Sequence, residues 1–302
     1  MSKPYLINIV GPTAIGKTSK SIALAQHFSS EILSADSRQF YKEMCIGTAV
    51  PTPEELAAAP HHFIQHVSVS EQYSVGDFEK DAFKKLDELF EKHKILFLVG
   101  GSGLYVDAVN KGLDHFPKVE ASIREKLNVQ VQEHGLASLQ LQLKELDPDH
   151  YKKVALSNPQ RVIRALEICL GTGKPYSSFL NHSAKERNFN SIKIGLEAPR
   201  PLIYERIEKR VDFMLENGLL EEAKELYPLR ELNALNTVGY KELFQYFDGT
   251  WSLEFALSEI KKNTRRFAKR QLTWFRRDEH TFWFPYDAAP QEIADFITQK
   301  VD

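Results

Sequence analysis

Eight consecutive residues near the start of the chain have the spacing of a phosphate-binding loop. They fit the pattern G-x-x-x-x-G-K-[ST] and are Gly11, Pro12, Thr13, Ala14, Ile15, Gly16, Lys17 and Thr18. The glycines let the backbone curl around an anion and turn its N–H groups inward, because no side chain blocks the approach. The Lys17 ammonium can reach an outer phosphate, and the Thr18 hydroxyl suits Mg²⁺ as a ligand. We therefore expect a diphosphate or triphosphate here, in preference to a turn that only caps a helix.

Two further polar segments follow apolar runs. Asp36-Ser37-Arg38-Gln39 follows residues 31–35, and Gly100-Gly101-Ser102-Gly103 follows residues 95–99. Open α/β sheets bind ligands at the carboxyl ends of their strands, so we expect both segments near the phosphate loop. The second run ends in glycine, where ATP-hydrolysing phosphate-loop proteins often place an Asp for Mg²⁺. This weakens an ATPase interpretation and leaves a kinase open.

The elements around these residues alternate between strand and helix. Apolar strands are expected at 5–10, 31–35, 95–99 and 191–196, with helices at 17–27, 77–93 and 201–217. From Leu113 to about 190 the chain is polar and helical, with helices at 124–134, 136–146 and 158–170. The sequence predicts an α/β fold: a phosphate-loop NTPase-like parallel sheet core (1–112 and 191–302) with C-terminal helices and a mostly helical insertion (113–190).

A basic segment runs from Lys261 to Arg277 without an acidic residue. On a helix, its cations stack at spacings of four residues, and like charges at that spacing destabilise a helix. Phosphate groups of a partner are therefore a better explanation than a solvated surface. The candidate phosphate contacts are Arg265, Arg266, Lys269 and Arg270. A phosphate loop together with a basic helix indicates two phosphate-bearing substrates.

Composition sets outer limits on the function. The 302 residues have 42% hydrophobic content and a formal net charge of −2, so nucleic-acid binding must come from a local patch. Two cysteines provide no disulfide framework, which fits a reducing compartment. No run is apolar and long enough for a membrane span, and the first residues do not form a signal segment. We expect a soluble cytoplasmic protein, a monomer without an obligate protein partner.

At this level of detail the chain resembles the bacterial tRNA dimethylallyltransferases. After the phosphate loop, the resemblance rests on motifs in family order at 35–41, 46–49, 99–105, 158–164, 206–210, 238–242 and 269–274. Three positions depart from the usual pattern. Ser102 replaces a Thr, and Cys45 and Val50 stand where many members have an Asp and a Lys.

The resemblance implies transfer of the dimethylallyl group from dimethylallyl diphosphate to the exocyclic N6 amine of an adenosine. That adenosine lies on the 3′ side of the anticodon, in tRNAs that read codons beginning with U. The phosphate loop and Arg210 would bind the diphosphate with Mg²⁺ on Thr18, and Asp36 would be the catalytic base, assisted by Lys17 and Thr18. The helical insertion would grip the anticodon stem-loop. The implied tRNA contacts are Asp36, Ser37, Arg38, Gln39, Ser102, Arg124, Gln160, Arg161, Val162, Ile163 and Arg164.

Two other functions remain open from the residues alone. A small-molecule or nucleoside kinase would explain the phosphate loop and Asp36, but it leaves the basic helix unexplained. An RNA-binding regulator without catalysis would explain the basic helix, but not the intact Lys17, Thr18 and Asp36. Salt separates a tRNA enzyme from a small-molecule kinase, because the tRNA enzyme should lose substrate affinity steeply as salt rises and the kinase should not.

Overall fold

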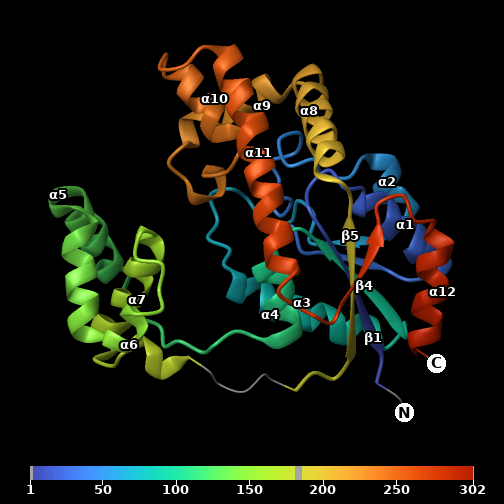
Figure 1. Ribbon diagram of the computed structural model, residues 1–302, viewed down its shortest axis with the longest axis horizontal. Coiled ribbons are helices and arrows are strands. Elements are labelled where there is room, and N and C mark those ends of the chain that lie inside the picture. The colour runs from blue at the N-terminus through green and yellow to red at the C-terminus, as the bar shows by residue number, and fades with distance from the viewer. Residues whose placement is uncertain (1–2, 181–185, 302) are drawn as a thin grey trace. The chain divides into compact units, whose positions relative to one another are not determined.

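Six parallel strands form the sheet that carries the phosphate loop. The computed structural model describes residues 3–180 and 186–301 (Figure 1). Its strands lie in the order β3-β2-β4-β1-β5-β6, and each neighbouring pair is parallel. The strands are β1 (Tyr5–Val10), β2 (Ile32–Ser34), β3 (His61–His62), β4 (Ile95–Gly100), β5 (Asn190–Glu197) and β6 (Thr281–Pro285). The fold class predicted from the sequence is confirmed.

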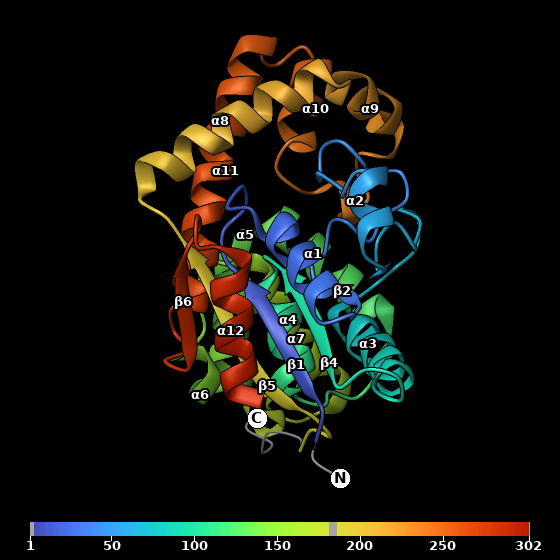
Figure 2. The ribbon, with the colours of Figure 1, turned by 90° about the vertical axis from the view of Figure 1, so that its right-hand side faces the viewer.

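The apolar runs are continuous because helices cover both faces of the sheet. Leu6, Leu96 and Leu98 belong to one core cluster, and their neighbours Ile7 and Phe97 belong to another. Successive side chains of a strand point to opposite faces, so each strand supplies both clusters. Helices α3 (Val75–Phe90) and α4 (Gly103–Lys111) contribute to the first cluster, whereas α1 (Lys17–His27) and α12 (Pro290–Val301) contribute to the second (Figure 2).

Further helices complete this part of the chain. A group of four lies beyond the carboxyl ends of the central strands (Figures 1 and 2). They are α8 (Arg200–Glu216), α9 (Leu219–Leu226), α10 (Tyr240–Phe247) and α11 (Leu253–Phe275). The short α2 (Pro53–Ala58) precedes β3, and 3-10 turns occupy Tyr227–Leu229 and Asn233–Leu235. Most of the basic segment, from Lys261 to Phe275, thus lies in α11, which begins at Leu253 because Ser252 caps it at the Phe255 N–H.

A second compact unit begins at Gly112, and the sheet unit resumes at Glu186. The second unit contains α5 (Ala121–Leu146), α6 (Pro148–Tyr151), α7 (Pro159–Thr172) and a 3-10 turn (Tyr176–Phe179). Gly135 interrupts α5 with φ 73°, at the position where the sequence predicts a break. Leu139, Leu143 and Leu166 form part of a core of its own. Both strand β5 and the sheet unit therefore start earlier than the predicted boundary near 190.

The predicted helix start at residue 77 was wrong. The Ser74 hydroxyl accepts the Asp77 N–H (3.2 Å), and the Asp77 carboxylate accepts the Ser74 N–H (3.0 Å). This reciprocal capping box places the helix start at Val75. The sequence analysis also missed β6 and α12, which close one edge of the sheet and cover one face.

No helix among the described residues is long and apolar enough to cross a membrane.

Candidate active site

Strand register brings the phosphate loop, Asp36 and Ser102 to one edge of the sheet. Val10 pairs with Gly100, and Ser34 pairs with Val99, so three strands end side by side. A cleft of about 450 Å³ opens there. Its lining includes residues 13–19 of the loop, Asp36 and Gln39, and Arg206, Lys209 and Arg210 of α8. Gly100 permits this arrangement, because a Cβ at that position would lie 2.4 Å from the Ala35 carbonyl oxygen.

The phosphate loop has the backbone shape of an anion site. Gly11, Ala14 and Gly16 have φ of 146°, 62° and 100°, which turns the chain tightly into α1. No side chain caps the start of α1. Its first N–H groups and the positive end of the helix dipole therefore remain available for an anion. The Lys17 ammonium donates to the carbonyl oxygens of Gly11 (3.1 Å) and Pro12 (2.8 Å), which holds it across the loop.

Three cations surround the loop, and Asp36 acts on two of them, Lys17 and Arg210, without forming an ion pair. Arg206 donates through Nε to the Ala14 carbonyl oxygen (2.7 Å), and Arg210 donates to the Thr13 hydroxyl (3.3 Å). Among residues 3–180 and 186–301, neither arginine nor Lys17 forms an ion pair. Burial lowers the pKa of Lys17 to about 8, with Asp36 opposing and Arg210 adding to this change. Burial also lowers the pKa of Arg210. The site is electrostatically prepared for an anion.

A side chain from α11 fixes the outer limb of the loop. The Gln271 amide oxygen accepts the Thr13 N–H (2.9 Å), and its nitrogen donates to the Gly101 carbonyl oxygen (3.0 Å). Gln271 is buried, and a Cβ at Gly101 would lie 2.1 Å from its amide nitrogen. One amide therefore ties the phosphate loop to the end of β4.

The Asp36 segment forms the opposite wall of the cleft. The Asp36 carboxylate accepts the Arg38 N–H (3.1 Å), which orients it at the end of β2. The Ser102 hydroxyl accepts the Ser37 N–H and contacts the Ser37 hydroxyl, both at 3.1 Å. Arg38 donates to the Ala234 carbonyl oxygen (2.7 Å). Gln39 donates to the carbonyl oxygens of Ala49 (2.8 Å) and Thr48 (3.3 Å). These residues are brought together as predicted, and Arg38 is occupied in holding the segment.

The donor set suits Mg²⁺ only in part. Thr18 lines the cleft, and its hydroxyl has no hydrogen-bond partner within the described parts of the chain. No group of three or more His, Cys, Asp or Glu side chains that could hold a metal ion occurs among the described residues. Mg²⁺ commonly takes one or two protein ligands and completes its shell with water and phosphate oxygens. A single hydroxyl beside a phosphate loop fits that mode.

In the helical unit, two of the predicted tRNA contacts meet at one acid, and a third contacts one of them. The buried Glu167 carboxylate pairs with Arg124 (3.2 Å) and Arg164 (2.9 Å). The Gln160 amide oxygen accepts from the second nitrogen of Arg124 (2.8 Å). Arg161 is exposed beside them.

The predicted tRNA contacts at Val162 and Ile163 require correction. Their side chains are 0% and 2% exposed and belong to the core of the helical unit. They pack α7 against α5, and so they support the arginines instead of contacting a ligand through their own side chains.

The basic face of α11 divides into paired and unpaired cations. Lys261 pairs with Asp212 (2.5 Å), and Arg265 pairs with Glu208 (2.8 Å), both acids being on α8. These two pairs offset part of the repulsion between like charges from which a phosphate partner was inferred, and the Arg265 pair joins α11 to α8. Arg266, Lys269 and Arg270 are exposed, and none of them is in an ion pair among the described residues.

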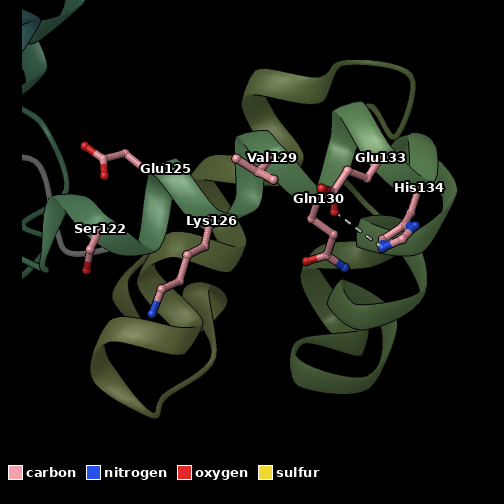
Figure 3. Close-up of a pocket in the computed structure, with 7 residues that line it drawn as sticks. All are labelled: Ser122, Glu125, Lys126, Val129, Gln130, Glu133 and His134. Atoms are coloured by element: carbon pink, nitrogen blue, oxygen red, sulfur yellow. Dashed lines mark ion pairs between the residues drawn. The ribbon is translucent and has the colours of Figure 1, made fainter.

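Another surface hollow lies along the first half of α5 (Figure 3). Its seven lining residues all come from one helix, and their side chains spread along it (Figure 3). The ion pair drawn there joins Glu133 to His134 at 3.8 Å. No loop, strand end or second element contributes to this lining. The hollow therefore lacks the convergence of groups that the cleft at the sheet edge has.

Arg206, Gln271 and Glu222 were not predicted as functional. Arg206 and Gln271 occur in motifs quoted for the family resemblance, at 206–210 and 269–274, so their position was signalled but not their role. Arg206 also lies four residues before Arg210, on the same helical face. Glu222, whose contacts with residues 45–47 are described below, had no signal, because it lies in an acidic stretch typical of an exposed helix.

Comparison with known proteins identifies the family. The sequence model of a family described as IPP transferase matches residues 39–278. A tRNA dimethylallyltransferase of Christiangramia forsetii is 64% identical over 298 residues, which cover 99% of each chain. A tRNA isopentenylpyrophosphate transferase of Bacillus halodurans superposes with a TM-score of 0.74 at 40% identity, covering 99% of this chain and 97% of that one. A eukaryotic dimethylallyltransferase acting on tRNA gives a TM-score of 0.81 at 28% identity, covering 99% and 80%.

Proposed function

The chain belongs to the IPP transferase family, and we propose that it transfers a dimethylallyl group from dimethylallyl diphosphate to the N6 amine of a tRNA adenosine. The adenosine would lie on the 3′ side of the anticodon, in tRNAs that read codons beginning with U. The observation that carries the proposal is a carboxylate, Asp36, in the same cleft as an anion site with uncompensated cations. The kinase alternative loses its support, because the relatives are named as prenyltransferases.

In the proposed reaction the phosphate loop binds the diphosphate. The loop N–H groups, Lys17 and Arg210 face the position where negative charge grows as the allylic C–O bond breaks. They stabilise the leaving diphosphate more than the bound donor, which lowers the barrier. Arg206 and Gln271 hold the loop in shape through Ala14 and Thr13.

On the acceptor side, the adenine amine attacks the allylic carbon, and an N–C bond forms as the C–O bond breaks. The amine is a weak nucleophile because its lone pair is delocalised into the ring. Asp36 takes the proton that the nitrogen loses, and the diphosphate leaves with the electron pair of the broken bond. To reach the cleft the adenosine leaves its stack, and we propose that Ser37, Gln39 and Ser102 contact it.

Thr18 would hold Mg²⁺, which supplies charge neutralisation of the diphosphate when bound. For the tRNA we propose contacts at Arg124, Gln160, Arg161 and Arg164 of the helical unit and at the unpaired cations of α11. We propose that the protein acts as a monomer. We propose the cytoplasm as its place of action, where tRNA is modified.

Transfer of a labelled dimethylallyl group to unmodified tRNA tests the proposal. Asp36→Ala should lower the rate by about 100- to 10,000-fold, because general base catalysis is lost. Asp36→Asn is the matched variant, since its amide oxygen can still accept the Arg38 N–H. It should lose activity equally while donor binding stays at the wild-type level. Wild-type protein that transfers no label, and consumes ATP with a small hydroxyl compound, would refute the proposal.

A further inference from the structure

Two sequence motifs that the proposed chemistry does not use meet at a single carboxylate. One is the segment at 46–49, and the other is the segment at 238–242. Between them lies Glu222 of α9, whose carboxylate accepts three consecutive backbone N–H groups. The distances are 2.9 Å from Cys45, 2.7 Å from Ile46 and 2.8 Å from Gly47. In Figure 2 the blue segment that leads to α2 lies next to α9.

Tyr240 of α10 completes this arrangement. Its hydroxyl donates to the Glu222 carboxylate (2.6 Å), and its side chain is fully buried. Its ring packs directly on Gly47, where a Cβ would lie 2.6 Å from the ring carbon that bears the hydroxyl. Gly47 and Tyr240 are therefore matched in shape. Consecutive N–H groups of this kind form a concave anion site, which an acidic side chain of the same chain fills here.

The segment that Glu222 holds is the one that orients Gln39. The carbonyl oxygens of Thr48 and Ala49 accept the Gln39 amide nitrogen at 3.3 Å and 2.8 Å. The Gln39 amide oxygen accepts the Ser34 hydroxyl (3.3 Å), and the same hydroxyl accepts the Asp36 N–H (3.3 Å). A continuous set of hydrogen bonds thus leads from α9 to the wall of the cleft that carries Asp36.

We propose that Glu222 is a positioning residue for the acceptor side of the cleft, acting through residues 45–49 and Gln39. The proposal rests on the proposed function. It explains why the two motifs occur in one chain, and it leaves the diphosphate site untouched, because no contact of Glu222 described here reaches residues 11–18. It also explains why Cys45 is tolerated where many members have Asp, since the contact uses its backbone N–H and not its side chain.

The test compares Glu222→Gln with Glu221→Gln, the neighbouring exposed acid on α9. A glutamine at 222 turns an N–H₂ toward backbone N–H donors and cannot satisfy all of them. Because small displacements at a reacting centre are costly, we expect kcat of transfer to fall about tenfold at saturating substrates. The dissociation constant for dimethylallyl diphosphate should stay unchanged, and Glu221→Gln should match the wild type.

A double-mutant cycle with Gln39→Leu separates positioning from general weakening. If Glu222 acts through Gln39, Glu222→Gln should cost less than about twofold in the Gln39→Leu background. A full tenfold cost in that background, an equal loss of donor affinity, or wild-type kcat in Glu222→Gln would each overturn the inference. If Glu222→Gln does not fold, Tyr240→Phe decides: it keeps the ring on Gly47, and a kcat equal to the wild type overturns the inference. A wild type without transfer activity would refute the proposed function itself.

Discussion

The two units of the molecule orient their cationic side chains with different partners. At the phosphate loop, Lys17, Arg206 and Arg210 donate to carbonyl and hydroxyl oxygens, which orient the charges without cancelling them. In the helical unit, Arg124 and Arg164 share the Glu167 carboxylate, which orients them and cancels part of their charge. The first arrangement maximises the field on a small anion. The second keeps two long side chains ordered on a surface that an extended polyanion would cover.

This difference suits the two substrates that we propose, a diphosphate and a tRNA. A diphosphate has few atoms, so tight binding needs strong and unscreened charges. A tRNA presents many phosphates, so each contact needs little energy, and excess charge would bind any RNA.

Removal of the loop cation should have the largest effect. Lys17→Met keeps most of the side-chain volume but removes the ammonium that we propose stabilises the leaving diphosphate. The rate of label transfer should fall about 1,000-fold, the upper range for one preorganised donor. Affinity for tRNA, measured by filter binding, should stay within a factor of two of the wild type. A parallel loss of tRNA affinity would contradict the assignment of the diphosphate and the tRNA to separate sets of cations.

Rising pH should weaken the same cation. Because burial lowers the pKa of Lys17 to about 8, the ammonium of the free enzyme loses its proton as pH rises through that value. The ratio kcat/KM for the donor, which reports groups of the free enzyme, should fall about tenfold per unit above that pH. Lys17→Arg should remove this limb from the profile, because arginine stays charged. The affinity for tRNA should not decrease over the same pH range.

Changes in the helical unit should act on tRNA alone. Arg164→Gln should weaken tRNA binding about fivefold, the value of one charge-assisted contact, with kcat unchanged at saturating tRNA. Glu167→Gln frees both arginines from their shared acid. It should therefore strengthen tRNA binding at low salt, provided that the variant folds as judged by its melting temperature. Equal weakening by both substitutions would show that the acid matters for orientation more than for charge.

The smallest effect should separate paired from unpaired cations on α11. Lys269→Gln removes an exposed, unpaired charge, so the slope of log affinity for tRNA against log salt should decrease by about 1. Arg265→Gln removes a cation that Glu208 already neutralises in part, so its slope should change less. Titrations at several salt concentrations measure both. Equal slopes for the two variants would contradict the distinction between paired and unpaired cations on α11.

The sequence predicted local structure well where the residues that determine an element lie within that element. The phosphate loop, α1 from Lys17 to His27 and the break at Gly135 need only spacing and backbone chemistry. The start of α3 was misplaced because both Ser74 and Asp77 can cap a helix, and the two cooperate in the structure. The C-terminal β6 and α12 have weaker patterns, and their burial depends on a sheet edge that is distant in sequence.

The site was predicted in part, and its gaps share a cause. Asp36 and the loop were found because strand ends converge in any parallel sheet. The roles of Arg206 and Gln271 depend on backbone atoms of residues that are far away in the chain, namely Ala14, Thr13 and Gly101. A single sequence does not indicate such partners. The ion pair of Arg265 was not predicted for the same reason, since Glu208 lies on another helix.

The position of β1 has a consequence for the newly made chain. Tyr5 pairs with Ile95 of β4 on one side and with Asn190 of β5 on the other. The central strand β1 therefore cannot complete its pairing until β5 has been synthesised. The helical unit is made in between and has its own short-range core. Contacts near in sequence form faster than distant ones, so we expect this unit to fold before the sheet is complete. The last-made part of the catalytic unit, including α11 and Gln271, then closes the phosphate loop from outside.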